Sequence, residues 1–141
     1  MNLEDTFFIN EVIATYSYTW DSADPDGWVD VFTNDGVMEF HRKESVDPEE
    51  RFVGRTALHE LAVNSFSGRG RNQPRHYQTG TVFLDLRAET AQTRTMVAVT
   101  WLPAGEITAS INWTGIYIDD WRKTETGWKI ARRALHLDQP A

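Results

Sequence analysis

The chain contains no cysteine, which excludes both a disulfide framework and a metal site built from thiolates. Long hydrophobic runs are also missing, since no stretch approaches the roughly 18 apolar residues of a membrane-spanning helix. Residues 1–5 are acidic and lack the basic start and apolar run of a signal peptide. We therefore expect a cytoplasmic protein that does not bind a membrane.

Positive charge is scarce, because 14 Lys and Arg face 21 Asp and Glu and the net charge is −7. Phosphate binding needs a basic face, so we expect no nucleic-acid partner. Aromatic side chains are plentiful, with six Trp, four Tyr and seven Phe. They could fill a core or line an apolar pocket. The length of 141 residues fits a single domain, residues 1–141, that can bury its own core.

Helical patterns dominate the first half of the chain. Residues 3–20 repeat apolar side chains at three- and four-residue spacing, which predicts an amphipathic helix. Asp24 can cap a second, short helix with Pro25 at its first position. Residues 54–66 suit a third helix. The charged, proline-containing residues 42–51 predict an exposed loop.

Turns and strands follow. Residues 34–36 (Asn-Asp-Gly) predict a turn before a short strand, and residues 67–72 predict a flexible connector. The later strands are expected over residues 75–87, 92–102, 107–122 and 127–137. Helices followed by a long antiparallel meander are the α+β pattern. We expect a cone, in which three N-terminal helices lie across a curved antiparallel or mixed sheet and enclose an apolar pocket.

Asp21 and His76 are the strongest candidates for chemistry. A neutral imidazole is a good general base, because its unperturbed pKa is about 6.5. A carboxylate bonded to its other ring nitrogen would fix the tautomer and stabilise the imidazolium. Such a dyad, without a nucleophilic Ser or Cys, suits removal of a proton from carbon. The alternative is structural: a solvated acid at a helix end and a satisfied histidine on a strand.

Metal-binding patterns are weak. Four acids lie close together, but a glycine and a terminal glutamate are not where an EF-hand loop needs them; these acids are Asp21, Asp24, Asp26 and Asp30. The four histidines are dispersed and show no ligand spacing. We expect no metal and no cofactor.

Several stretches carry a resemblance to a known family: residues 9–16, Asp21, residues 28–36, residues 75–77 and residues 127–133. With them the chain resembles SnoaL-like proteins of the nuclear transport factor 2-like superfamily over nearly its whole length. The resemblance implies a cone fold and a homo-oligomer, either a dimer or a trimer. It says less about function, because this fold hosts many activities and some ligand binders.

The functional pattern resembles hexachlorocyclohexane dehydrochlorinase and scytalone dehydratase, which abstract a proton with an Asp–His dyad. The resemblance implies these roles for Asp21 and His76. It also implies that Arg133 stabilises a departing anion; a surface cation is the alternative. Two departures stand out, because Tyr16 replaces a lysine of the dehydrochlorinase and Phe40 replaces a water-positioning tyrosine of scytalone dehydratase. The second active-site histidine of scytalone dehydratase has no counterpart either.

Candidate substrate-binding residues are mostly aromatic. The set is Tyr16, Trp20, Phe32, Phe40, Phe66, Asn112, Trp113 and Tyr117. Tyr16 could donate a phenolic hydrogen bond, and Asn112 could bind a carbonyl. The alternatives are that these residues form the core or a contact between subunits.

The sequence therefore predicts a cofactor-independent lyase or isomerase that acts on a hydrophobic cyclic small molecule by dehydration, elimination, isomerisation or cyclisation. Two alternatives stay open. One is a non-catalytic binding or assembly module with the same cone. The other is an epoxide hydrolase, which would need an Asp/Arg/Asp cluster in the pocket and no histidine. A short distance between Asp21 and His76 would favour the first function.

Overall fold

A computed structural model describes residues 2–140. The three helices are α1 (Leu3–Asp21), α2 (Pro25–Val29) and α3 (Arg55–Arg69). The six strands are β1 (Phe32–His41), β2 (Glu50–Val53), β3 (Gln73–Leu86), β4 (Thr90–Leu102), β5 (Ser110–Thr124) and β6 (Gly127–Leu137).

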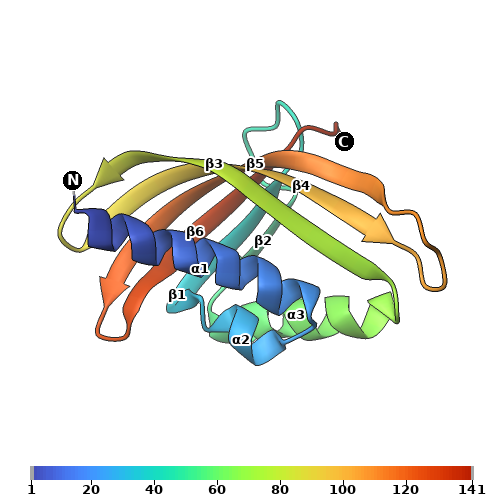
Figure 1. Ribbon diagram of the computed structural model, residues 1–141. Coiled ribbons are helices and arrows are strands. Elements are labelled where there is room, and N and C mark those ends of the chain that lie inside the picture. The colour runs from blue at the N-terminus through green and yellow to red at the C-terminus, as the bar shows by residue number, and fades with distance from the viewer. Residues whose placement is uncertain (1, 141) are drawn as a thin grey trace.

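The strands form one sheet in the order β2-β1-β6-β5-β4-β3, in which β1 and β6 are parallel and all other neighbours are antiparallel. The sheet is strongly curved but not closed, and the three helices lie together on its concave side (Figure 1). The α+β class, the mixed sheet and the cone of the sequence prediction are confirmed.

The first helices begin as the sequence predicts. The side chain of Asn2 accepts a hydrogen bond from the backbone N–H of Glu4 at the start of α1. Asp24 accepts one from the N–H of Gly27, and Pro25 is the first residue of α2. Such caps satisfy N–H groups that have no partner within the helix. The chain thus turns sharply after Asp21 and places the end of α1 against the sheet.

Three local predictions are wrong, and tertiary contacts explain each of them. The predicted turn at residues 34–36 lies inside β1, where the register against β6 shifts between Phe32 and Val37. The predicted loop at residues 42–51 ends in β2, because Arg51 pairs with Glu39 on β1. Residues 67–69 of the predicted connector continue α3 to Arg69, whose side chain donates hydrogen bonds to the backbone of α1.

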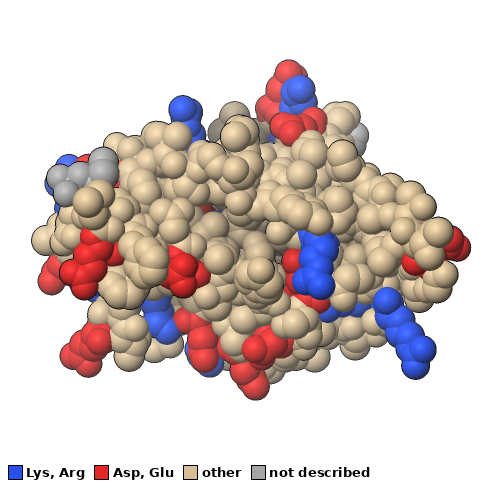
Figure 2. Space-filling view, viewed as in Figure 1, with Lys and Arg blue, Asp and Glu red and all other residues tan. Residues whose placement is uncertain are grey.

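The core lies between the sheet and the helices, and Trp28, Trp121 and Trp128 are buried in it. Within residues 2–140, no helix combines the length and the hydrophobicity needed to cross a membrane. On the face drawn in Figure 2, Lys and Arg side chains are scattered among Asp and Glu and do not gather in one basic patch.

Gly115 tests the packing of β5 against β6. A Cβ at this position would lie 2.5 Å from the carbonyl oxygen of His136, so Gly115→Ala forces a backbone shift. We expect it to lower the free energy of unfolding by about 1–3 kcal/mol in urea denaturation. Gly68→Ala is the control, because its Cβ would meet nothing within 4 Å in α3. It should raise stability by up to about 1 kcal/mol, and equal effects of the two substitutions would contradict the register.

Candidate active site

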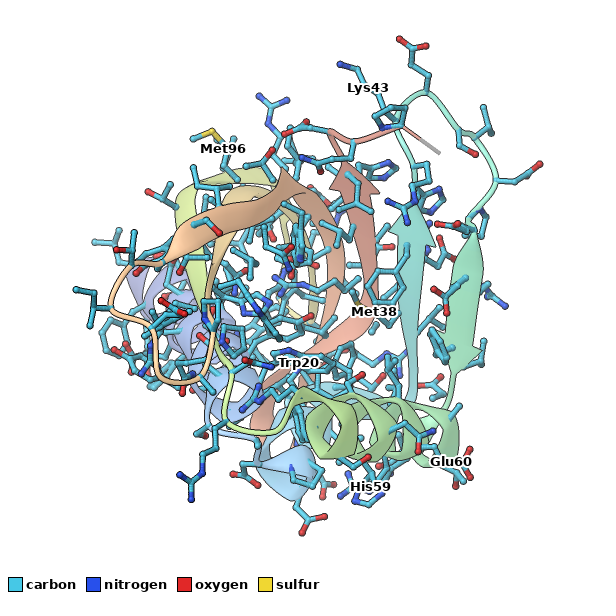
Figure 3. All side chains as sticks on the ribbon, turned by 90° about the vertical axis from the view of Figure 1, so that its right-hand side faces the viewer. Trp20, Met38, Lys43, His59, Glu60 and Met96 are labelled. Carbon is cyan, nitrogen blue, oxygen red and sulfur yellow. The ribbon has the colours of Figure 1, made fainter. Side chains whose placement is uncertain are left out.

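A cavity of about 670 Å³ lies between the sheet and the helices. Trp, Tyr and Phe side chains form a large part of its wall, and one of them, Trp20, lies between α3 and the sheet (Figure 3). Of the predicted binding residues, those that line the cavity are Tyr16, Trp20, Phe40, Phe66, Asn112, Trp113 and Tyr117. Phe32 does not line it, because its ring packs behind the wall against Trp28, with ring centroids 5.0 Å apart. The space is large enough for a small cyclic molecule.

Asp21 and His76 are in direct contact. The carboxylate oxygen Oδ1 of Asp21 lies 2.6 Å from Nδ1 of His76, and Oδ2 accepts a hydrogen bond of 2.9 Å from the backbone N–H of His76. The two side chains are only 3% and 5% exposed. A carboxylate only accepts, so Nδ1 carries the hydrogen and Nε2 is the free acceptor of the ring. One carboxylate therefore fixes both the backbone and the ring of His76.

Two side chains hold the end of α1 where Asp21 needs it. Arg69, the last residue of α3, donates hydrogen bonds of 2.8 Å to the backbone carbonyls of Trp20 and Asp21. Gln73, at the start of β3, donates another to the carbonyl of Asp21. The carbonyl of Asp21 is one of those left without an intrahelical partner at a helix end, whereas the carbonyl of Trp20 also accepts from the backbone N–H of Ala23. The end of α1, the end of α3 and the start of β3 are thereby joined at the dyad.

The His76 ring lies in an aromatic cage at the cavity wall. Its centroid is 6.1 Å from that of Tyr16, 6.4 Å from that of Trp20 and 5.8 Å from that of Trp113, all with rings nearly perpendicular. Among residues 2–140, the hydrogen bonds of His76 to side chains come from its backbone N–H and from Nδ1, both with Asp21, and not from Nε2. His76 lines the cavity, whereas Asp21 lies behind it. A base so placed can take a proton from a molecule in the cavity.

Arg133 is neither a surface cation nor part of the cavity wall. It is fully buried and forms a two-pronged ion pair with Asp119, with N–O distances of 2.7 and 2.8 Å. Its guanidinium lies 4.2 Å from the ring centroid of Tyr16 and 3.7 Å from that of Tyr117. These two tyrosines stand between Arg133 and the cavity. Nη2 of Arg133 also donates to Gln78.

Burial and pairing shift the pKa of both partners. Burial raises the pKa of Asp119, and the positive charge of Arg133 opposes this rise. Burial alone would lower the pKa of Arg133, but the charge and hydrogen bonds of Asp119 outweigh it and raise the pKa above its usual range. The pair is thus a fixed, charged support beneath the tyrosines.

The sequence reasoning missed several residues of this site. Trp28, Trp101 and Arg69 line the cavity, and Asp119 holds Arg133. Asp119 lies on the same face of β5 as Tyr117, two residues away, which is a signal in the sequence. Arg69 gave no such signal, because its role depends on how α3 meets α1. In the described chain, no group of three or more His, Cys, Asp or Glu residues is placed to hold a metal ion.

The chain matches one known family and several solved structures over most of its length. The SnoaL-like domain family matches residues 1–134. An Asp-to-Asn variant of Rv3472 from Mycobacterium tuberculosis is 28% identical, with a TM-score of 0.81 over 94% of this chain and 71% of that one. Among curated proteins, no sequence matches significantly.

Two further solved structures share the fold at lower identity. A scytalone dehydratase candidate from Novosphingobium aromaticivorans is 22% identical, with a TM-score of 0.82 over 98% of this chain and 87% of that one. A protein from Catenulispora acidiphila in complex with S-DNPA is 21% identical, with a TM-score of 0.76 over 94% of this chain and 92% of that one. At these identities the likeness concerns the fold alone.

The buried ion pair predicts a large difference between two arginine substitutions. Arg133→Met leaves Asp119 charged and unpaired in the core, so we expect a loss of about 3–5 kcal/mol in the free energy of unfolding. Arg122→Met is the matched control, because its ion pair with Asp35 is at least half exposed. It should cost less than about 1 kcal/mol. Chemical denaturation compares the two, and similar losses would contradict the burial of Arg133.

Proposed function

The chain belongs to the SnoaL-like family, and we propose that it removes a proton from a carbon atom of a hydrophobic cyclic small molecule. The observation that carries this proposal is the 2.6 Å contact between Asp21 and His76 at the wall of an aromatic cavity. The reaction would be a dehydration, elimination, isomerisation or cyclisation.

The geometry supports a division of labour within the dyad. His76 accepts the proton at Nε2, and the electron pair of the broken C–H bond stays on the substrate. The ring then carries a positive charge in an apolar environment, which is costly without a counterion. Asp21 lies against Nδ1 and stabilises that charge. Because His76 N–H also holds the carboxylate, the ring keeps its orientation without help from the substrate.

The relatives support a role in binding or transforming small molecules. Within this fold, the Catenulispora protein holds a small molecule, S-DNPA, and another relative is described as a scytalone dehydratase candidate. Both share the fold of this chain, and the cavity described above lies between the same kind of sheet and helices. The aromatic wall favours a flat or cyclic hydrophobic ligand.

The two alternatives differ from this proposal in what lines the cavity. A binding module needs the cavity but no base at its wall, whereas His76 lines the cavity with Nδ1 held by Asp21. An epoxide hydrolase would need an arginine and two aspartates at the ligand. Arg133 and Asp119 are both 0% exposed and lie outside the cavity wall, while His76 lines it. The arrangement therefore favours the lyase or isomerase.

Hydrogen exchange on a simple ketone tests the proposal without the natural substrate. In heavy water, NMR follows the loss of hydrogen from the carbon next to the carbonyl of 1-tetralone and related cyclic ketones. We expect the protein to catalyse this exchange. His76→Gln should lower the rate at least about hundredfold, because general-base catalysis contributes that much. Asp21→Asn should lower it too, since a neutral amide cannot stabilise the imidazolium.

His59→Gln is the matched control. His59 also pairs with an aspartate, with Nε2 3.0 Å from Oδ1 of Asp26. That pair is exposed, and His59 lies on the outer side of α3, away from the cavity (Figure 3). Its substitution should leave exchange unchanged. Exchange no faster than in buffer, or equally fast in wild type and His76→Gln, would rule out the proposal.

A further inference from the structure

Arg69 is a cation at the wall of the cavity. It is the last residue of α3, and it lines the cavity together with Trp20 and His76. The central carbon of its guanidinium lies 5.1 Å from the ring centroid of Phe66, which is also part of the wall. Arg133, by contrast, lies behind the wall. Arg69 therefore offers a positive charge to a molecule in the cavity.

Two of the five side-chain N–H groups of Arg69 have partners in the protein. Nη1 donates to the carbonyl of Trp20, and Nη2 donates to the carbonyl of Asp21. Among residues 2–140, no acceptor binds the Nε–H group. A carboxylate can bind the side of a guanidinium where Nε–H and a second hydrogen of Nη2 point the same way. That side of Arg69 is left for a ligand.

Negative charge near Arg69 does not balance its positive charge. In the described part of the chain, no carboxylate forms an ion pair with it, and the carboxylate of Asp21 is bonded to His76. Burial lowers the pKa of Arg69; the charge of Asp21 opposes this effect only in part, and the charge of Arg75 adds to it. The guanidinium still keeps its charge at neutral pH. A negative group on the ligand would supply the missing partner.

The other charged side chains of the wall differ from Arg69 in this respect. Arg42 also lines the cavity, but it pairs with Glu49 at an N–O distance of 2.6 Å. Glu50, the first residue of β2, lines the cavity as an exposed side chain and forms no ion pair with Arg69. Arg69 is thus the cavity-lining arginine that no carboxylate among residues 2–140 neutralises.

Trp20 connects Arg69 with the candidate base. Its ring centroid lies 4.8 Å from that of Phe66, on which Arg69 packs, and 6.4 Å from that of His76. Its backbone carbonyl accepts one of the hydrogen bonds of Arg69. Figure 3 shows Trp20 between α3, which ends in Arg69, and the sheet, which carries His76. A flat ring that packs on Trp20 can therefore have one edge near His76 and another near Arg69.

We propose that Arg69 binds a carboxylate of the ligand, so that the substrate is a hydrophobic cyclic acid. This inference rests on the proposed function and names its substrate class. Arg69 holds the carboxylate through Nε–H and Nη2–H, the ring packs on Trp20, and one C–H bond of the ring faces Nε2 of His76. The carboxylate does not react. It orients the ligand so that the carbon to be deprotonated lies at the base.

A matched pair of probes, 2-naphthoate and 2-naphthamide, tests the carboxylate site. They have the same two rings and similar size and differ in charge. At about pH 8 an unperturbed imidazole is neutral, so His76 does not attract the anion. In calorimetric titrations we expect the wild-type protein to bind 2-naphthoate at least about tenfold more tightly, because hydrogen bonds to charged groups contribute that much.

Two substitutions of Arg69 separate charge from shape. Arg69→Gln should abolish the preference for 2-naphthoate and leave the affinity for 2-naphthamide nearly unchanged. Arg69→Lys should keep part of the preference, because an ammonium group retains the charge but not the planar fork. In wild-type protein labelled with nitrogen-15 at arginine, the Nε–H signal of Arg69 should shift with 2-naphthoate and not with 2-naphthamide. This last measurement does not depend on how well a variant folds.

Arg55→Gln is the control on the same helix. Arg55 is the first residue of α3 and pairs with Asp30, and both side chains are about half exposed. Its substitution should leave the preference unchanged. Wild-type protein that binds 2-naphthoate no more tightly than 2-naphthamide, or not at all, would overturn the inference. So would an Arg69→Gln variant that weakens both probes equally, or a preference that is lost in His76→Gln and kept in Arg69→Gln.

The two proposals fail separately, because binding of these probes needs no turnover. If His76→Gln loses hydrogen exchange on 1-tetralone while the wild-type protein shows no preference for 2-naphthoate, only the role of Arg69 is wrong. If no exchange occurs but Arg69→Gln loses the preference, only the reaction is wrong.

Discussion

The contact between Asp21 and His76 is the interaction on which the site depends. It joins the end of α1 to β3, across 55 residues of the chain. The same carboxylate accepts from the ring and from the backbone of His76, so strand position and ring orientation are set together. Arg69 and Gln73 fix the helix end from the other side. The cavity wall is therefore built around this link, with His76 on its inner surface.

A second polar element lies deeper, beneath the aromatic wall. Arg133 and Asp119 are fully buried, and the removal of two charges from water is expensive even when they pair. Such a pair adds little stability compared with apolar residues of the same volume, so its value must lie elsewhere. Here it supports Tyr16 and Tyr117 where they line the cavity. His76 thus has a charged residue against its ring, and the two tyrosines have a charged pair behind theirs.

The sequence predicts the class of fold, because hydrophobic periodicity and helix caps are local patterns. It points to Asp21 and His76 through the chemistry of a carboxylate with an imidazole and through the family resemblance. It could not predict the partner of Arg133. Near the turn of the β5–β6 hairpin, Thr124 pairs with Gly127. If this register continued along the two strands, Asp119 would lie opposite Arg132. A register shift between Asp120 and Trp121 moves Asp119 opposite Arg133 instead. Such a shift depends on how the sheet curves, which no local pattern records.

The tautomer of His76 tests the central claim most directly. In protein labelled with nitrogen-15 at histidine, NMR distinguishes the two ring nitrogens of the neutral imidazole. The account predicts that Nδ1 carries the hydrogen, bonded to Asp21, and that Nε2 is the unprotonated nitrogen facing the cavity. It also predicts that Asp21→Ala loses this preference. A hydrogen on Nε2 in the neutral wild-type ring would contradict the account, because that nitrogen could not then accept a proton from a ligand.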